Sequence, residues 1–218
     1  RFVADASHEL RTPLTSIRGF AELHRQGAVP EGEKTKELIS RIEKESMRMG
    51  SLVEDLLMLA RIDQSREIVM ADVDLSTLIK EAVTSAQVAG PEHPITSDIA
   101  HDVHTQGDSD KIYQVVTNLL ANARAHTPAG THIHVATYSN EDGSYITVAD
   151  KGPGLTAENQ KHIFERFYRV DTSRQRSSSD GSGLGLSIVD EVMKAHGGSV
   201  SVSSEPGNGA TFTLHFKA

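Results

Sequence analysis

The stretch ASHELRTPL, residues 6–14, lies in a helical pattern but contains residues that a purely structural helix does not need. Apolar residues around it recur at steps of three or four, the periodicity of an amphipathic helix. This stripe consists of Val3, Ala6, Leu10, Leu14, Ile17 and Ala21. Within the stretch, His8 stands beside Glu9, and Pro13 removes a backbone donor from the helix. The stretch therefore predicts a helix that carries a chemical group on its polar face.

A loop and a second apolar stripe follow this helix. Glycines and prolines break the pattern over residues 24–32. The second stripe consists of Leu38, Ile42, Met49, Leu52, Leu56 and Leu59. Two amphipathic helices joined by a short loop form a hairpin, and each would leave one flank of its stripe in water. Two hairpins packed as a four-helix bundle bury both flanks, so we expect a homodimer; packing against the rest of the same chain is the alternative.

The composition excludes several classes of protein. The chain has 218 residues, a formal net charge of −8 and no dense run of Lys or Arg, which argues against nucleic-acid binding. Cysteine is absent, so disulfides and Cys-ligated metals are excluded. No apolar run approaches the ~18 residues that a membrane span needs. We therefore expect a soluble fragment that makes no membrane contact.

The pattern changes from about residue 68 onward. The expected elements are a helix at 74–86 capped by Asp74 or Ser76, strands near 95–99 and 103–106, a helix at 110–126, a hairpin over 132–150, helices at 157–168 and 184–196, and a hairpin over 199–216. Mixed helices and antiparallel strands indicate an α+β layer domain. The predicted division is a helical hairpin at 1–66, a linker at 67–73 and a second domain at 74–218.

The polar face of the first helix is expected to carry His8. At about 100° per residue, the mean direction of the stripe lies roughly 155° from His8, so the imidazole faces water. Thr12 lies on nearly the same side, four residues later. A neutral imidazole nitrogen is a nucleophile, and the adjacent carboxylate of Glu9 can accept the proton of the other ring nitrogen. Pro13 clashes with the carbonyl of Glu9, which predicts a bend; a plain exposed histidine is the alternative.

The same residues resemble a known family. The segment FVADASHELRTPLTSIRGFAEL, residues 2–23, closely resembles the phosphoacceptor box of sensor histidine kinases. In that family the histidine is phosphorylated by ATP and the next acid acts as base, which implies these roles for His8 and Glu9. The family's Thr or Asn four residues after the histidine orients water for hydrolysis of the phosphorylated partner. Thr12 occupies that position, so the resemblance also implies phosphatase activity.

The second domain contains several motifs that are weak when taken singly. Asn118 and Asn122 share a helix face, and their carbonyl oxygens are suitable Mg²⁺ ligands. The stretch DKGPGL begins at Asp150 and is also compatible with a simple turn. The stretch DGSGLGLSIV places three glycines before a helix, where a backbone can approach phosphates. Flexible loops and the hairpin turn PGNGATF are the structural alternatives.

In this order, however, the motifs resemble the N, G1, F, G2 and G3 boxes of the histidine-kinase ATP-binding domain. This domain has the Bergerat fold, a two-layer α/β sandwich shared with gyrase, and the match covers about residues 107–213. The resemblance implies that Asn122 is a Mg²⁺ ligand with Asn118 in support. It also implies that Asp150 accepts a hydrogen bond from the adenine amino group, in a pocket shaped by Gly152 and Gly154.

The resemblance further implies how the phosphates of ATP are held. Three glycines would flank the triphosphate: Gly181, Gly183 and Gly185. Arg169 matches an arginine near the γ-phosphate, where positive charge stabilises phosphoryl transfer. The polar stretch DTSRQRSSSDG, residues 171–181, matches a lid that orders over the nucleotide. Four further residues are its expected anchors or contacts: Phe164, Phe167, Arg174 and Arg176.

The sequence departs from the family at one position. The family often has a Lys three residues after the second Asn, where this chain has Ala125. An aromatic residue is common at the next position, which is His126 here. That Lys is expected to touch phosphate, so the departure puts the cation on this side in doubt. Arg124 and His126 are the candidates to replace it.

The family resemblance predicts a dimeric histidine kinase core that uses ATP and Mg²⁺. The phosphoryl group would pass from His8 to an aspartate on the receiver domain of a response regulator. An ATP-binding scaffold without transfer and a chiefly phosphatase enzyme are the alternatives. The resemblance implies the cytoplasmic portion of a membrane-anchored sensor, with sensing segments before Arg1. The sequence does not give the signal, the cognate regulator, or whether transfer runs within or between subunits.

Overall fold

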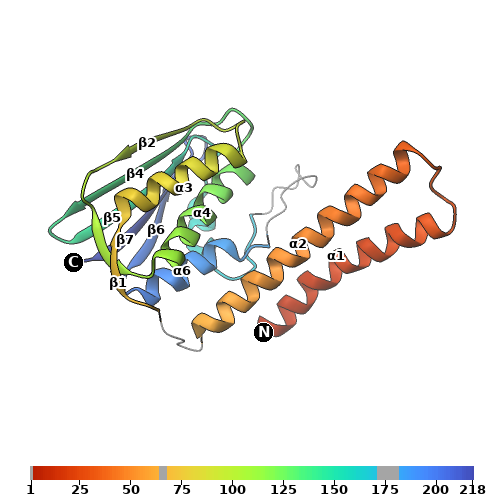
Figure 1. The fold of residues 1–218 in the computed structure, drawn as a ribbon, viewed down its shortest axis with the longest axis horizontal. Helices are drawn as coiled ribbons and strands as arrows, with labels where there is room; N and C mark the ends of the chain where they lie inside the picture. The colour runs from red at the N-terminus through yellow and green to blue at the C-terminus, as the bar shows by residue number, and fades with distance from the viewer. Residues whose placement is uncertain (1, 64–67, 171–181) are drawn as a thin grey trace.

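The computed structural model describes residues 2–63, 68–170 and 182–218. The chain begins with two long helices, α1 (Phe2–Arg25) and α2 (Glu33–Asp63), which lie against each other as an antiparallel hairpin (Figure 1). The loop between them falls at the predicted position, and Gly27 and Gly32 take positive φ values of 69° and 102° there. The predicted helical hairpin is therefore confirmed. No helix in the described ranges combines the length and apolarity needed to cross a membrane.

The seam between α1 and α2 differs slightly from the predicted stripe of α1. Ala6 and Pro13 are buried, whereas Leu14 is 56% exposed and Ala21 is also exposed. The buried line follows a seven-residue repeat from Ala6 to Pro13, which favours the proline over its neighbour. The stripe of α2 is confirmed by its three buried members, Leu38, Leu52 and Leu59.

Helix α1 continues through Pro13 from Phe2 to Arg25. Around the proline, hydroxyl groups donate to carbonyls four residues earlier. The bonds run from Thr12 to His8 (3.4 Å), from Thr15 to Arg11 (2.8 Å) and from Ser16 to Thr12 (3.3 Å). Side-chain bonds of this kind compete with the regular backbone ladder, which Pro13 has already depleted by one donor. The bend at Pro13 stays a prediction.

The second part of the chain is an α/β domain with two layers. Five strands form a sheet in the order β2-β4-β5-β7-β6. They are β2 (Ile95–Ile99), β4 (Ile133–Asn140), β5 (Gly143–Asp150), β6 (Ser199–Ser204) and β7 (Ala210–Lys217). Strand β2 runs parallel to β4, and the other three pairs are antiparallel. One face is covered by the helices α3 (Leu75–Ala89), α4 (Ser109–Ala125) and α6 (Gly185–Ala195), as Figure 1 shows.

Alternation along the strands explains why the helices cover one face. Ile133 and Val135 on β4 are fully buried, whereas His134 and Ala136, which point to the other face, are only partly buried. The neighbouring strands contribute Ile146, Val148, Phe212, Leu214 and Phe216 to the same layer. These side chains and those of the three helices form one buried cluster. Burying each of the large apolar side chains contributes about 1.5–3 kcal/mol to the free energy of folding. The predicted α+β architecture is confirmed.

Helix caps set where the helices begin. Asp74 is the N-cap of α3, and its carboxylate accepts bonds from the backbone N–H (3.1 Å) and hydroxyl (2.6 Å) of Thr77. Asp108 caps α4 by accepting from the backbone of Asp110 and Lys111, both at 3.1 Å. The predicted start of α3 near Asp74 is thus confirmed. Ser76 does not cap the helix; its hydroxyl bonds to the backbone of residues 100 and 103.

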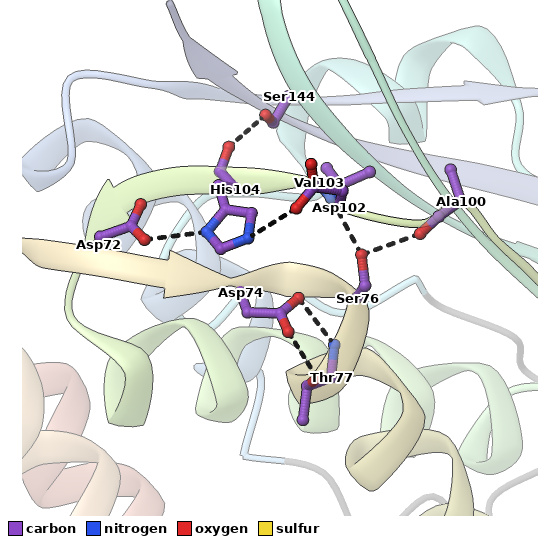
Figure 2. A network of polar contacts seen from close by, with 9 residues as sticks. All are labelled: Asp72, Asp74, Ser76, Thr77, Ala100, Asp102, Val103, His104 and Ser144. Atoms are coloured by element: carbon purple, nitrogen blue, oxygen red, sulfur yellow. Dashed lines mark hydrogen bonds and ion pairs between the residues drawn. The ribbon is translucent and has the colours of Figure 1, made fainter.

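A polar network joins the small sheet of β1 (Ala71–Asp74) and β3 (His104–Gly107) to the rest of the domain (Figure 2). The Ser76 hydroxyl donates to the carbonyl of Ala100 (2.8 Å) and accepts from the backbone of Val103 (3.0 Å). The His104 ring lies 2.9 Å from the carboxylate of Asp72 and 3.4 Å from that of Asp102. This network fixes the first strand after the hairpin against the domain.

Two predicted boundaries are wrong. The helix predicted at 157–168 is α5 (Ala157–His162), which is followed by turns closed by backbone bonds from Glu165 to His162 and from Tyr168 to Glu165. Phe167, within these turns, takes a left-handed φ of 64°. Residues 71–73, predicted as linker, form strand β1 by pairing with β3. A strand of four residues carries too little periodicity to be recognised in a sequence. Of the other predicted linker residues, 68–70 belong to the described ranges and form neither helix nor strand.

The hairpin and the α/β domain share part of one core. Helix α2 packs on α6, and its residues Leu52, Met58 and Leu59 belong to the buried cluster that includes the α6 side chains. Leu59 is fully buried. The alternative that the hairpin packs against its own chain is therefore correct for the C-terminal half of α2.

The network around His104 makes a pH-dependent contribution to stability. The hydrogen bond to Asp72, with the charges of Asp72, Asp74 and Asp102, raises the pKa of His104 above the usual 6.5. A raised folded-state pKa means that protonation stabilises the fold below about pH 6.5 and that this stabilisation is lost as the pH rises through the folded pKa. We expect Asp72→Asn to destabilise the domain more at about pH 6 than at about pH 8.5 in urea unfolding. Glu141→Gln, an exposed change in the β4–β5 turn, is the control; an equal loss at both pH values would contradict the assignment.

Candidate functional site

The first group of predicted residues lies on one exposed face of α1. His8 and Thr12 are exposed, and Glu9 is partly exposed. The Thr12 hydroxyl is one helical turn from His8 and donates to its backbone carbonyl at 3.4 Å. Within the described ranges, no residue makes a hydrogen bond or ion pair with the His8 imidazole. The predicted orientation of His8 toward water is confirmed, and both ring nitrogens are accessible to a reactant.

The asparagine pair lies on α4, which packs over the central strand β5 of the sheet. Both Asn118 and Asn122 are partly buried. The amide nitrogen of Asn118 is buried and has no hydrogen-bond partner among the described residues. The backbone carbonyl of Asn122 accepts the backbone N–H of His126, the C-cap residue of α4, at 3.1 Å. An unpaired buried amide is costly in a structural helix, so this position is suited to a polar ligand.

Asp150 ends strand β5 and is partly buried. Burial raises the pKa of Asp150, while hydrogen bonds from the backbone of Gly152 and Ala210 and the charge of His126 oppose the rise. The Gly152 N–H donates to the carboxylate at 2.8 Å. Asp150 is therefore a desolvated acceptor with a fixed orientation, which suits recognition of a neutral donor such as an amino group.

The loop after Asp150 is packed tightly on the turn between β6 and β7. Gly209 has φ of 79°, and a Cβ there would overlap the carbonyl oxygen of Asp150. Gly154 has φ of 69°, and a Cβ there would overlap the carbonyl oxygen of Glu205. The backbone N–H of Gly207 donates to the carbonyl of Pro153 at 2.7 Å. The glycines of two sequence motifs thus bring two loops together below the Asp150 carboxylate.

Residue 127 was not singled out from the sequence, yet it lies in the wall of this site. A Cβ on Gly152 would fall 2.5 Å from the methyl carbon of Thr127. The Thr127 hydroxyl donates to the carbonyl of Ala123 at 2.7 Å, which holds the methyl group toward the loop. Only Gly at position 152 accommodates this wall. The sequence contains no signal for Thr127, because its role depends on a contact between distant segments.

Electrostatics connect the end of α4 with Asp150 and Arg169. Burial and the charge of Arg169 lower the pKa of His126, and the charge of Asp150 opposes this. Because these charges act on one another, the three residues lie in one region, although the outer side of His126 is exposed. A lowered pKa leaves the His126 imidazole neutral near pH 7.

The two candidates for the missing lysine point in different directions. Arg124 donates to the carbonyl of Ala86 at 3.3 Å and packs against Gly90 at the end of α3. It therefore lies away from Asp150 and cannot supply the cation there. His126 is on the correct side but uncharged near neutral pH. Ala125 is exposed.

The aromatic residues before the predicted lid have separate contacts. Phe164 meets Phe212 edge to face, with ring centroids 6.3 Å apart, so it belongs to the core. The backbone N–H of Phe167 donates to the carbonyl of Gly183 at 2.9 Å, which ties the loop after α5 to the glycine loop before α6. Gly185 begins α6. The predicted lid, residues 171–181, lies outside the described residues, and with it Arg174, Arg176 and Gly181.

Two family models match the chain on either side of this arrangement. Residues 1–65 match the His Kinase A (phospho-acceptor) domain, and residues 107–218 match the histidine kinase-, DNA gyrase B-, and HSP90-like ATPase model. The second match alone covers half of the chain. The chain belongs to the sensor histidine kinases.

Known proteins support this membership. The probable sensor histidine kinase TcrY of Mycobacterium tuberculosis is 48% identical over 209 residues, which cover 95% of this chain and 43% of that protein. Full-length ShkA in complex with AMPPNP is 29% identical, with a TM-score of 0.68 and coverage of 99% of this chain and 46% of that chain. The histidine kinase ThkA, in complex with the response regulator protein TrrA, has the same fold with a TM-score of 0.77, 24% identity, and coverage of 99% of this chain and 60% of that chain. This histidine kinase core thus spans less than half of TcrY.

The packing around Gly209 gives a test of the pocket in this histidine kinase core. Gly207 and Gly209 have similar φ values of 86° and 79°, but a Cβ on Gly207 meets nothing within 4 Å. We expect Gly207→Ala to cost about 1–2 kcal/mol of stability from backbone strain alone. Gly209→Ala should cost more than that and should also weaken binding of a fluorescent ATP analogue, because it displaces the end of β5 with Asp150. Equal effects of the two changes on nucleotide binding would argue against the proposed pocket.

Proposed function

We propose that this core transfers the γ-phosphoryl group of ATP to His8 and then to an aspartate of a response regulator. The observation that carries the proposal is the pairing of two sites in one chain. An exposed imidazole beside a carboxylate lies on a helical hairpin, and the attached domain carries the partly buried carboxylate of Asp150 and the unpaired amide of Asn118. Neither site alone accounts for phosphoryl transfer to protein.

Asp150 is proposed to recognise the adenine ring. Its carboxylate is oriented by Gly152 and held over the packed loops, so it can accept a hydrogen bond from the adenine amino group. Gly152 and Gly154 keep the pocket open because side chains at these positions would occupy it or displace its walls. Gly183 and Gly185, with Gly181 before them, are proposed to flank the triphosphate at the start of α6, where backbone N–H groups are unpaired.

The residues present fit Mg²⁺. The carbonyl oxygens of Asn118 and Asn122 are hard neutral donors, which Mg²⁺ accepts beside phosphate oxygens and water. The unpaired amide of Asn118 would be satisfied by an oxygen-rich ligand. Among the described residues, no cluster of three or more His, Asp or Glu offers an alternative metal site. When bound, Mg²⁺ would neutralise charge on the β- and γ-phosphates.

The proposed transfer step uses the helix-face residues. A ring nitrogen of His8 attacks the γ-phosphorus, so a P–N bond forms while the bond from that phosphorus to the bridging oxygen breaks and ADP leaves. Glu9 takes the proton from the other ring nitrogen as positive charge develops on the imidazole. Arg169 is proposed to stabilise the charge on the γ-phosphoryl group. Its charge lowers the pKa of His126, which also interacts with Asp150, so Arg169 lies on the same side of the domain.

A response regulator is the proposed acceptor of the phosphoryl group. ThkA, which shares the fold, is described in complex with a response regulator protein. The exposed surface around His8 leaves room for a receiver domain to approach the phosphohistidine. Thr12 is exposed on the same face, and we assign to it the orientation of water for hydrolysis of the phosphorylated regulator. The placement of this core on the cytoplasmic side of a membrane-anchored sensor is likewise a proposal, based on its similarity to sensor kinases.

A second copy of the hairpin is the proposed partner of the apolar residues that α1 and α2 leave exposed. Six large apolar residues of these helices are 41–60% exposed: Leu14, Leu23, Ile39, Met47, Val53 and Leu57. Most of the large exposed apolar residues of the described chain belong to this set. Exposed apolar surface on both helices favours association, and a four-helix bundle of two hairpins would bury those residues that face the second copy.

The test is incubation with Mg²⁺ and ATP labelled at the γ-phosphate. We expect acid-labile label on the parent and no label on His8→Gln. His24→Gln is the control, because His24 is also an exposed histidine of α1. Label that survives in His8→Gln would contradict the assignment of the acceptor. Absence of label from the parent, with nucleotide still bound, would favour an ATP-binding scaffold or a phosphatase and would make Ala125 the first position to change.

A further inference from the structure

One buried histidine contacts the segment that forms the wall of the Asp150 pocket. His93 lies in the loop between α3 and β2 and is only 5% exposed. Its Nε2 atom is 3.4 Å from the backbone carbonyl of Thr127, the residue whose methyl group limits the space at Gly152. A carbonyl oxygen only accepts hydrogen bonds, so Nε2 carries a proton and donates it here. His93 thus holds the backbone of the pocket wall.

The loop that carries His93 is itself held in place by backbone hydrogen bonds on both sides of the ring. The carbonyl of Glu92 accepts the N–H of Gly130 at 2.8 Å. The carbonyl of Pro94 accepts the N–H of Ile133 at 2.9 Å. These bonds tie the loop after α3 to the segment that links α4 with β4. The imidazole therefore reaches the pocket wall from a loop that is fixed to the same segment.

Three contacts lead from the His93 ring to the carboxylate of Asp150. The Thr127 carbonyl accepts the bond from the ring, and the Thr127 hydroxyl donates to the carbonyl of Ala123 at 2.7 Å. These two bonds fix the direction of the Thr127 methyl group, which lies against Gly152. The Gly152 N–H in turn donates to the Asp150 carboxylate at 2.8 Å. A shift of the wall would therefore move the donor that orients the carboxylate.

The second nitrogen of the His93 ring lacks a hydrogen bond. Its Nδ1 atom is buried, has no hydrogen-bond partner among the described residues, and lies 3.6 Å from a carboxylate oxygen of Glu92. A buried nitrogen without a bond costs free energy. An apolar side chain would avoid this cost but would leave the Thr127 carbonyl without its donor. The bond to Thr127 is thus the feature of this site that needs a histidine.

We propose that His93 is a positioning residue for adenine, which holds the pocket wall through Thr127 and thereby the direction of the Asp150 carboxylate. This role rests on the proposed contact between Asp150 and the adenine amino group. Adenine carries an amino group where guanine carries a carbonyl oxygen, and a carboxylate accepts from the first and repels the second. A carboxylate held in one direction discriminates between them better than one that can turn away. His93 therefore contributes to selectivity for ATP over GTP without touching the base.

The first test is competition by ATP and by GTP against a fluorescent ATP analogue that is labelled on its ribose. His93→Leu removes the donor and keeps a side chain in the buried site. We expect its affinity for ATP to fall about fivefold or more and its affinity for GTP to change by less than about twofold, because only ATP uses the oriented carboxylate. His93→Gln places an amide N–H near the position of Nε2 and should restore most of the ATP affinity. His196→Leu is the matched control, because His196 is also buried but contacts Asp108 and the end of α6 instead of the pocket wall.

A double-mutant cycle tests whether His93 acts through Thr127. Thr127→Ser removes the methyl group and keeps a hydroxyl that can donate to Ala123, so it should also lower the ATP affinity. When His93→Leu is added, the loss should be no larger than the larger of the two single losses, because both changes release the same wall. Two losses that multiply would contradict transmission through Thr127.

The remaining outcomes separate this role from the function on which it rests. An unchanged ratio of ATP to GTP affinity in His93→Leu, whether both affinities fall or neither falls, would overturn the positioning role alone. If thermal unfolding shows that His93→Leu does not fold, His93→Asn replaces it, because the shorter amide does not reach the Thr127 carbonyl; it should lower the ratio where His93→Gln does not. A parent that binds neither nucleotide, or both equally, would instead overturn the proposed adenine site.

Discussion

The contact between α2 and α6 is the interaction on which the arrangement of this histidine kinase core depends. Leu59 of α2 is fully buried in the same cluster as the helices of the ATP-binding domain, so a phosphoacceptor hairpin and a nucleotide site share a core. Leu52 and Met58 of α2 belong to the same cluster, and Leu10 of α1 packs against it. Apolar burial therefore holds the hairpin and the ATP-binding domain together in this structure.

A second constraint operates within the ATP-binding domain, where two loops approach too closely for side chains. The carbonyl oxygen of Asp150 occupies the space next to Gly209, and the loop after Asp150 leans on the turn of the last hairpin. This packing partly buries the carboxylate, which raises its pKa, while Gly152 fixes its direction. The proposed recognition of a neutral amino group depends on this close approach of the two backbones at the glycines. The glycines that allow the two loops to pack therefore also position the carboxylate proposed to bind adenine.

Periodicity in the sequence predicted the hairpin, the sheet strands and most helices, because alternation and helical stripes are local properties. The roles of the glycines and asparagines came from the resemblance of their motifs to those of histidine kinases, and these roles stay predictions. Other features depend on distant contacts. Choosing Pro13 over Leu14 for the seam requires knowledge of the facing helix, and Thr127 matters only because Gly152 packs on it. The bond between Asp55 and Ser182 joins residues 127 positions apart and has no local signal. The left-handed turn at Phe167 likewise follows from its bond to Gly183.

The central claim is that the Asp150 pocket supplies the phosphoryl group that His8 receives. Site-resolved mass spectrometry of the protein after incubation with Mg²⁺ and ATP tests it most directly, with Asp150→Asn beside the parent. Asp190→Asn, which alters a carboxylate paired with Lys194 on α6, serves as the control. The account predicts a phosphoryl group on His8 of the parent and the control, reduced by more than about tenfold in Asp150→Asn. The amide has a single acceptor oxygen, whereas the carboxylate has one for the Gly152 N–H and a second for the adenine amino group. Full phosphorylation of His8 in Asp150→Asn, or a phosphoryl group on a different residue of the parent, would contradict it.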